Sequence, residues 1–129
     1  MQNESSAKPP RDLRQRTREF SLRIIRMVQA MPRNRVAGVI GDQVLRCGTS
    51  VGANYRAACR SRSQAEFISK MHIVLEEADE SQYRMELLVA SHVMPETRLQ
   101  NLMKEAEELV AIAVASINTA RRKQKATKT

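Results

Sequence analysis

The feature that most constrains this chain is the spacing of its apolar residues, which recur every three or four positions through four long segments. This spacing places apolar side chains on one face of an α-helix. We therefore predict four helices, at about residues 12–31, 36–60, 63–91 and 95–120. Pro32 ends the first of them, because a residue that precedes proline is displaced from the helical region.

The connections between the four segments are only a few residues long. Helices joined by short loops pack as antiparallel neighbours, so we predict an all-α, antiparallel up-and-down four-helix bundle over residues 12–122. Residues 1–11 and 123–129 are expected to be flexible ends, the second of them a basic tail. A long two-helix hairpin that buries its core only by oligomerising is the alternative. Aromatic residues are 3% of the chain, and 4 Gly and 4 Pro are too few for the frequent turns of a sandwich or barrel.

Two observations predict a cytoplasmic protein without a membrane partner. The N-terminus has no apolar segment of the kind found in secretory signals, and the longest apolar run, residues 109–117, is far shorter than the ~20 residues of a membrane span.

Cys47 and Cys59 fall in one predicted helix, about 18 Å apart at ~1.5 Å per residue, too far for a disulfide. We interpret both as reduced thiols packed as small hydrophobic side chains.

Positive charge is concentrated near the N-terminus. The chain has a net charge of +8, and residues 1–35 carry nine Lys or Arg against three Asp or Glu, a net +6. Arginine binds two phosphate oxygens at once, so such a surface is typical of proteins that bind a nucleic-acid backbone. A solvated face that only keeps the protein soluble is the alternative. The residues predicted to bind nucleic acid are Arg11, Arg14, Arg18, Arg23, Arg26, Arg121, Arg122 and Lys123.

All four glycines lie in the second predicted helix, on one stripe. Glycine inside a helix costs about 1 kcal/mol relative to alanine, so we predict close approach by another helix or by a second copy of the chain. Local flexibility is the alternative. Leu22 and Ile25 lie among the arginines of the first helix, outside its core face, and indicate self-association. The glycines of this stripe are Gly38, Gly41, Gly48 and Gly52.

One polar residue falls on the apolar face of the second helix. Asn54 is predicted to be buried, and a buried amide needs hydrogen-bond partners. We predict a structural role in which Asn54 fixes helix register by bonding to the third helix, with Glu80 as the expected partner. A ligand-binding role is the alternative.

No catalytic or metal-binding motif stands out. His72 and Glu76 are four residues apart on one helix but lack a third ligand, and neither His72 nor His92 belongs to a Glu-x-x-His motif of di-iron bundles. The chain has no Ser/His/Asp set and no phosphate-binding glycine loop. We predict a non-enzymatic protein without metal or cofactor. An enzyme with a carboxylate site around Glu76 and Glu80 is a weaker hypothesis.

The segment that joins the second and third helices carries a family resemblance. Residues 43–54 read QVLRCGTSVGAN and residues 60–68 read RSRSQAEFI. They resemble the four-helix-bundle family of 23S rRNA intervening-sequence proteins, which includes the accessory variability (Avd-like) proteins of diversity-generating retroelements. The likeness covers about residues 12–122. One departure is Ala57-Ala58, where the family usually has Glu-Gly. The polar residues that the resemblance marks as structural are Gln43, Arg46, Ser50, Asn54 and Glu80.

The resemblance implies a bundle protomer that assembles into a homo-oligomeric ring of five subunits. It also implies association with structured RNA or DNA and, in the retroelement branch, with a reverse transcriptase. The leading hypothesis is therefore a non-enzymatic, homo-oligomeric accessory protein that binds RNA or DNA. The alternative is a protein-interaction scaffold for an acidic partner, such as a reverse transcriptase or another RNA-processing protein, without direct nucleic-acid binding.

Overall fold

The structure, a computed structural model, describes residues 12–128, and in that range the chain is helical with no strand. The predicted all-α class and the four helices are confirmed. The helices are α2 (Leu13–Gln29), α3 (Arg35–Cys59), α4 (Gln64–Ala90) and α5 (Glu96–Lys128).

The C-terminal end of α5 differs from the prediction. We predicted that the bundle ends near residue 122 and that a tail follows, whereas the helix continues to Lys128. The sequence RRKQKATK at this end consists mostly of strong helix formers, with neither glycine nor proline to interrupt them. The cationic side chains of this segment are therefore carried on a helix.

Local sequence explains where the helices begin. The side chains of Asp12 and Asn34 accept hydrogen bonds from backbone N–H groups in the first turns of α2 and α3. Ser63 caps α4 by accepting from the N–H of Glu66, whose carboxylate accepts from the N–H of Arg62. These caps satisfy N–H groups that have no partner within the helix.

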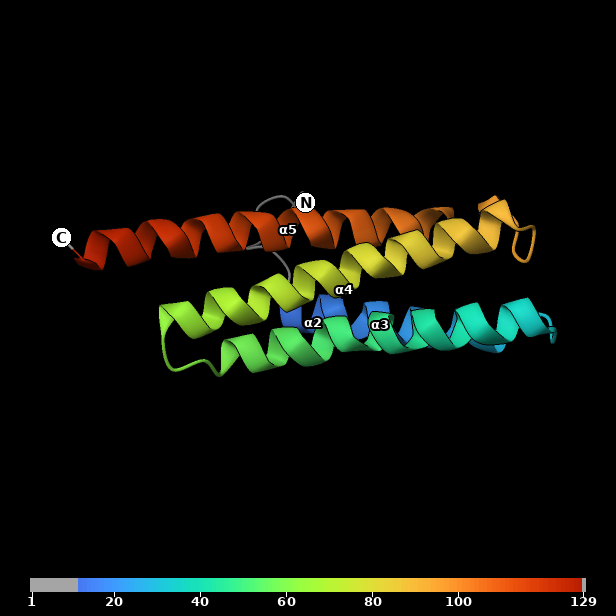
Figure 1. Cartoon of the computed structure of the whole chain (residues 1–129), viewed down its shortest axis with the longest axis horizontal. Coiled ribbons are helices and arrows are strands. Elements are labelled where there is room, and N and C mark those ends of the chain that lie inside the picture. Colours follow the sequence, from blue (N-terminus) through green and yellow to red (C-terminus); the bar gives the residue numbers. More distant parts are fainter. Residues whose placement is uncertain (1–11, 129) are drawn as a thin grey trace, which may run out of the picture.

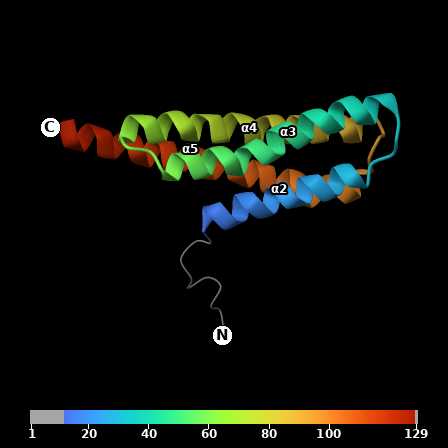
Figure 2. The ribbon, with the colours of Figure 1, turned by 90° about the horizontal axis from the view of Figure 1, so that it is seen from below.

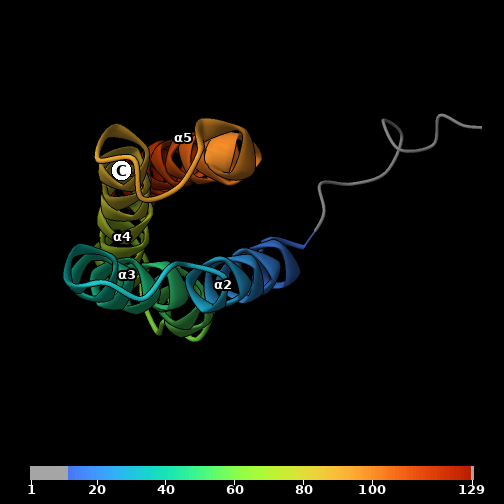
Figure 3. The ribbon, with the colours of Figure 1, turned by 90° about the vertical axis from the view of Figure 1, so that its right-hand side faces the viewer.

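The helices run alternately up and down, as predicted (Figure 1). Viewed along the bundle, α2, α3, α4 and α5 follow one another around an open arc (Figure 3). Each helix packs against its neighbour in sequence, and the contact between α2 and α5 is the smallest of the helix–helix contacts. Because α2 is the shortest helix, the C-terminal end of α5 extends well past it (Figure 2).

The core draws on all four helices and follows the predicted apolar faces closely. The buried alanines of α5, Ala106, Ala113 and Ala120, alternate with larger side chains, which lets the helices approach one another. Val36 is an exception, since it is exposed and its neighbour Ala37 is buried. The largest fully buried apolar side chains are Phe20, Ile24, Met71, Met85, Leu88, Leu99, Leu109, Val44, Val51 and Val74. None of the helices between residues 12 and 128 is apolar enough along its length to cross a membrane.

Candidate nucleic-acid interface

The arginines of α2 lie on the faces that the core leaves free. Four positions at helical spacing point inward, with Phe20 and Ile24 at the centre. Arg14, Arg18 and Arg26 are exposed and Arg23 is partly exposed. Arg11, which was also predicted to bind nucleic acid, lies outside the described residues.

Arg16, which was not among the predicted binding residues, joins α2 to α5. Its Nε lies 2.7 Å from Oε2 of Glu105 and its Nη2 lies 2.9 Å from Oε1, and it also pairs with Glu108. The side chains of Arg16 and Glu105 are only 20% and 15% exposed. These carboxylates raise the pKa of Arg16 above its usual value. The Arg16 guanidinium therefore links α2 to α5 through these ion pairs.

A groove runs between the C-terminal half of α2 and the N-terminal end of α5, and we call it the α2–α5 groove. Its volume is about 380 Å³, and its floor is apolar. No acidic residue lines it, and no carboxylate in the described part of the chain is paired with its arginines. The residues that line it are Arg23, Arg26, Met27, Met94, Arg98, Asn101 and Leu102.

Two polar residues of this groove were missed from the sequence. Arg98 and Asn101 are three positions apart and flank the buried Leu99 and Leu102. Their spacing places them on one side of the helix. The up-and-down order of the helices brings the start of α5 next to the end of α2. From this topology, one could have predicted that Arg98 and Asn101 lie near Arg23.

The other predicted cations lie at the far end of α5. Arg121, Arg122 and Lys123 are exposed. Arg121 Nη2 lies 3.2 Å from Nε2 of His72. From Arg98 to Arg121 the helix rises about 35 Å at ~1.5 Å per residue. The predicted basic set is therefore split into separate patches.

A second, larger groove lies at this far end, between the first turn of α2, the turn after α3 and the C-terminal half of α5. Its volume is about 910 Å³, and apolar side chains such as Phe67 and Ile112 line it. Arg62 and Lys123 also line it, and one nearby polar atom, Oγ of Ser61, is buried without a hydrogen-bond partner. We call this the far groove.

Three of the four glycines lie against α2 within the same chain. A Cβ on Gly48 would lie 2.8 Å from the side chain of Ile24, and one on Gly52 would lie 3.4 Å from Thr17. Gly41 packs near Met31, whereas Gly38 has no neighbour within 4 Å of such an atom. The close approach is thus to a helix of the same bundle, which leaves Gly38 alone facing open space. Leu22 is exposed and Ile25 is half-buried.

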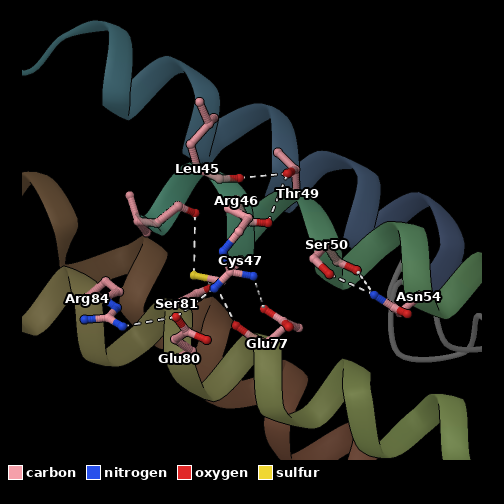
Figure 4. A network of polar contacts seen from close by, with 11 residues as sticks. Leu45, Arg46, Cys47, Thr49, Ser50, Asn54, Glu77, Glu80, Ser81 and Arg84 are labelled. Atoms are coloured by element: carbon pink, nitrogen blue, oxygen red, sulfur yellow. Dashed lines mark hydrogen bonds and ion pairs between the residues drawn. The ribbon is translucent and has the colours of Figure 1, made fainter. Parts of the chain in front are cut away.

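Four polar residues of the family motif form two separate groups, Arg46 with Glu80 and Ser50 with Asn54 (Figure 4). Arg46 lies 3.0 Å from Glu80 and 3.5 Å from Glu77. Arg84 also lies 3.2 Å from Glu80. The ion pairs of Arg46 join α3 to α4, whereas the pair of Arg84 and Glu80 lies within α4.

The predicted bond from Asn54 to Glu80 is wrong. Asn54 Nδ2 donates to the carbonyl oxygen of Ser50 at 2.9 Å and to its Oγ at 2.8 Å, both within α3. Glu80 lies at the level of Arg46, and eight residues of helix carry Asn54 about 12 Å beyond that level. Asn54 is half-buried, as is Gln43.

The two cysteines are free, as predicted, but only one is packed. Cys47 is fully buried and lies 3.3 Å from the hydroxyl of Ser81, and burial raises the pKa of its thiol. Cys59 is exposed although its neighbour Ala58 is buried in the core, so the two residues lie on different faces of α3 and the predicted packing of Cys59 is wrong. Partial burial and the neighbouring Cys59 raise the pKa of Tyr55 to about 12.

A catalytic centre does not emerge around the acidic residues of α4. Glu76 is exposed and Glu80 is engaged in ion pairs. Among residues 12–128 no three His, Cys, Asp or Glu side chains lie close enough together to hold a metal ion.

Comparison with known proteins identifies the family to which the chain belongs. A crystal structure of a protein of unknown function from the S23 ribosomal protein family of Bacteroides thetaiotaomicron has a TM-score of 0.73 and 29% identity to it. That match covers 82% of this chain and 98% of the other. No curated protein matches. The model of the 23S rRNA-intervening sequence protein family matches residues 11–115, so this chain belongs to that family, as the motif in α3 and α4 predicted.

Proposed function

We propose that this protein is a non-enzymatic, cytoplasmic accessory protein that binds the backbone of RNA or DNA as a homo-oligomer. The observation that carries the proposal is the set of arginines on α2 and at the start of α5 that have no carboxylate partner in the described residues. Arg16 differs from them, because it is paired with Glu105 and joins α2 to α5. Unpaired arginines on a basic protein favour a polyanionic partner.

Exposed apolar side chains support the oligomeric part of the proposal. Leu22, Val36, Val39 and Val114 are each more than one-third exposed. We propose that contact between copies of the chain covers these side chains. We propose a ring of five subunits, the assembly that the family resemblance implies. Sedimentation velocity on the full chain tests it: a species of five protomers is expected, and a monomer at ~50 μM, a concentration at which stable rings persist, contradicts it.

Fluorescence anisotropy tests nucleic-acid binding. A structured RNA and a duplex DNA would be titrated at ~50 and ~200 mM salt. If six or more phosphates are contacted, affinity should fall by about 10³-fold across that range. Sequence should matter little, because backbone contacts carry no base information. Weak binding to both ligands at the lower salt contradicts the proposal.

The far groove favours a second candidate function. Its apolar lining with Arg62 and Lys123 suits an amphipathic acidic segment of a protein partner, such as a reverse transcriptase or another nucleic-acid enzyme. As a scaffold, the protein would retain such a partner after nuclease treatment. Loss of the partner on nuclease treatment would instead show that nucleic acid bridges the two proteins.

A further inference from the structure

We infer that the α2–α5 groove is a phosphate cradle, in which guanidinium groups from two helices hold one backbone phosphate of the bound nucleic acid. The inference rests on the proposed function and assigns it to one place on the molecule. It selects Arg23 and Arg26 from the predicted cations and adds Arg98 and Asn101, which the sequence had not indicated.

The arrangement of donors supports this assignment. Each helix supplies two polar side chains three residues apart, Arg23 and Arg26 from α2 and Arg98 and Asn101 from α5. Residues at this spacing are neighbours on a helix surface. The groove therefore has hydrogen-bond donors on both walls, and a tetrahedral phosphate can accept from both at once.

The electrostatics of the groove favour an anion. Three guanidinium groups around one groove repel one another when no counter-charge is present. The neighbouring pair Arg16 and Glu105 shows how the fold neutralises a cation that it uses for stability. The buried Met27, Met94 and Leu102 make the floor apolar, which strengthens the interaction between the arginines and a bound charge.

The arginines of the groove also differ from the remaining basic residues in where they lie on the molecule. Arg14 is directed toward α3, where the Cys59 side chain is its neighbour. Arg121 and Arg122 lie at the other end of α5. In the α2–α5 groove, by contrast, arginines of α2 and of α5 line one volume.

A charge-matched pair of triple variants tests the inference in the full chain. The groove variant is R23Q/R26Q/R98Q, and the control R56Q/R60Q/R62Q removes three exposed arginines from the far end of α3 and the turn after it. Each variant lowers the net charge equally. Binding to a 24-bp RNA duplex and a 24-bp DNA duplex would be measured at several salt concentrations, with circular dichroism to check the fold.

The groove variant should lose at least about 10-fold more affinity than the control, and its salt slope should fall by about 2–3. The variant R23K/R26K/R98K keeps the charge but lacks the planar fork of arginine, so it should retain most of the slope and lose affinity several-fold. Equal losses in the groove and control variants, with tight binding by the wild type, would overturn the inference and leave the proposed function standing. Absence of binding by the wild type would overturn both.

Discussion

Gly48 of α3 faces the side chain of Ile24 of α2 so closely that a Cβ at this glycine would lie 2.8 Å from Cγ1 and 3.0 Å from Cγ2 of the isoleucine. Ile24 is fully buried, and its branched side chain has few alternative rotamers. The absence of a side chain at residue 48 thus sets the distance between these two helices. Packing inside the bundle therefore accounts for Gly41, Gly48 and Gly52 of the stripe but not for Gly38.

Replacing Gly48 with alanine should destabilise the fold. Overpacking a tight contact costs about 1–3 kcal/mol, which outweighs the gain of about 1 kcal/mol in helix propensity. Gly38→Ala is the control, because nothing lies within 4 Å of the added Cβ, and it should stabilise the protein by about 0.5–1 kcal/mol. Urea denaturation measures both. If Gly48→Ala were as stable as Gly38→Ala, Ile24 would have room to move.

The turn between α4 and α5 offers a stabilising substitution. His92 has a backbone φ of 64°, the left-handed region that glycine adopts without strain. His92→Gly should therefore raise the free energy of unfolding by about 1 kcal/mol. His92→Ala keeps the strained backbone and should bring no such gain. Thermal unfolding of the two variants compares them, and equal melting temperatures would count against strain at this residue.

A double-mutant cycle would measure how strongly α2 is held to α5. Arg16→Gln, Glu105→Gln and the double variant should give a coupling free energy of about 1–2 kcal/mol, because the pair is bidentate and mostly shielded from water. The same cycle on Arg46 and Glu77 should give a clearly smaller coupling free energy, since the Arg46 side chain is 59% exposed and water screens the pair. Similar values for the two cycles would contradict this distinction.

The fold could be predicted from the sequence because both the helices and the order in which they pack depend on local sequence patterns. Helical spacing of apolar residues located Phe20 and Ile24 in the core, and short connections fixed the antiparallel order. The end of α5 was misplaced because an exposed helix of good helix formers carries no apolar pattern. Val36 was wrongly assigned to the core face. At the start of α3, a shift of one residue decides which side chain is buried, and the buried one is Ala37.

The candidate site was less predictable, because it depends on which residues of different helices lie at one level. Net charge identified the arginines of α2 but not Arg98, which stands apart from the other cations in the sequence of α5. The same limit explains the wrong partner for Asn54, since periodicity gives the face of a residue and not its height along the bundle. Glu80 meets Arg46 because of the register between α3 and α4.

The two thiols should differ sharply in reactivity. The thiolate is the reactive form, and burial both raises the pKa of Cys47 and keeps reagents away from it. At pH 8 the folded protein should react with Ellman's reagent at Cys59 alone, which is exposed. The variant Cys59→Ser should react only after denaturant is added. Rapid reaction of that variant without denaturant would show that α3 and α4 separate easily around Cys47.

Deletion of residues 121–129 separates the contribution of the distal cations from that of the groove. Ala120 is the last buried residue of α5, so the core should remain intact and the free energy of unfolding should change by less than about 1 kcal/mol. The deleted cations lie about 35 Å from Arg98 along the helix. An 8-bp DNA duplex, about 27 Å long at ~3.4 Å per base pair, cannot reach both patches of one protomer.

The deletion should therefore weaken binding to a 24-bp duplex and leave binding to an 8-bp duplex held in the groove unchanged. Anisotropy titrations with the two duplexes, each compared with the groove variant R23Q/R26Q/R98Q, measure this difference. The groove variant should weaken binding to both lengths, because its residues contact the shorter duplex as well. Equal losses on both duplexes after the deletion would mean that the end of α5 from one protomer lies beside the α2–α5 groove of another.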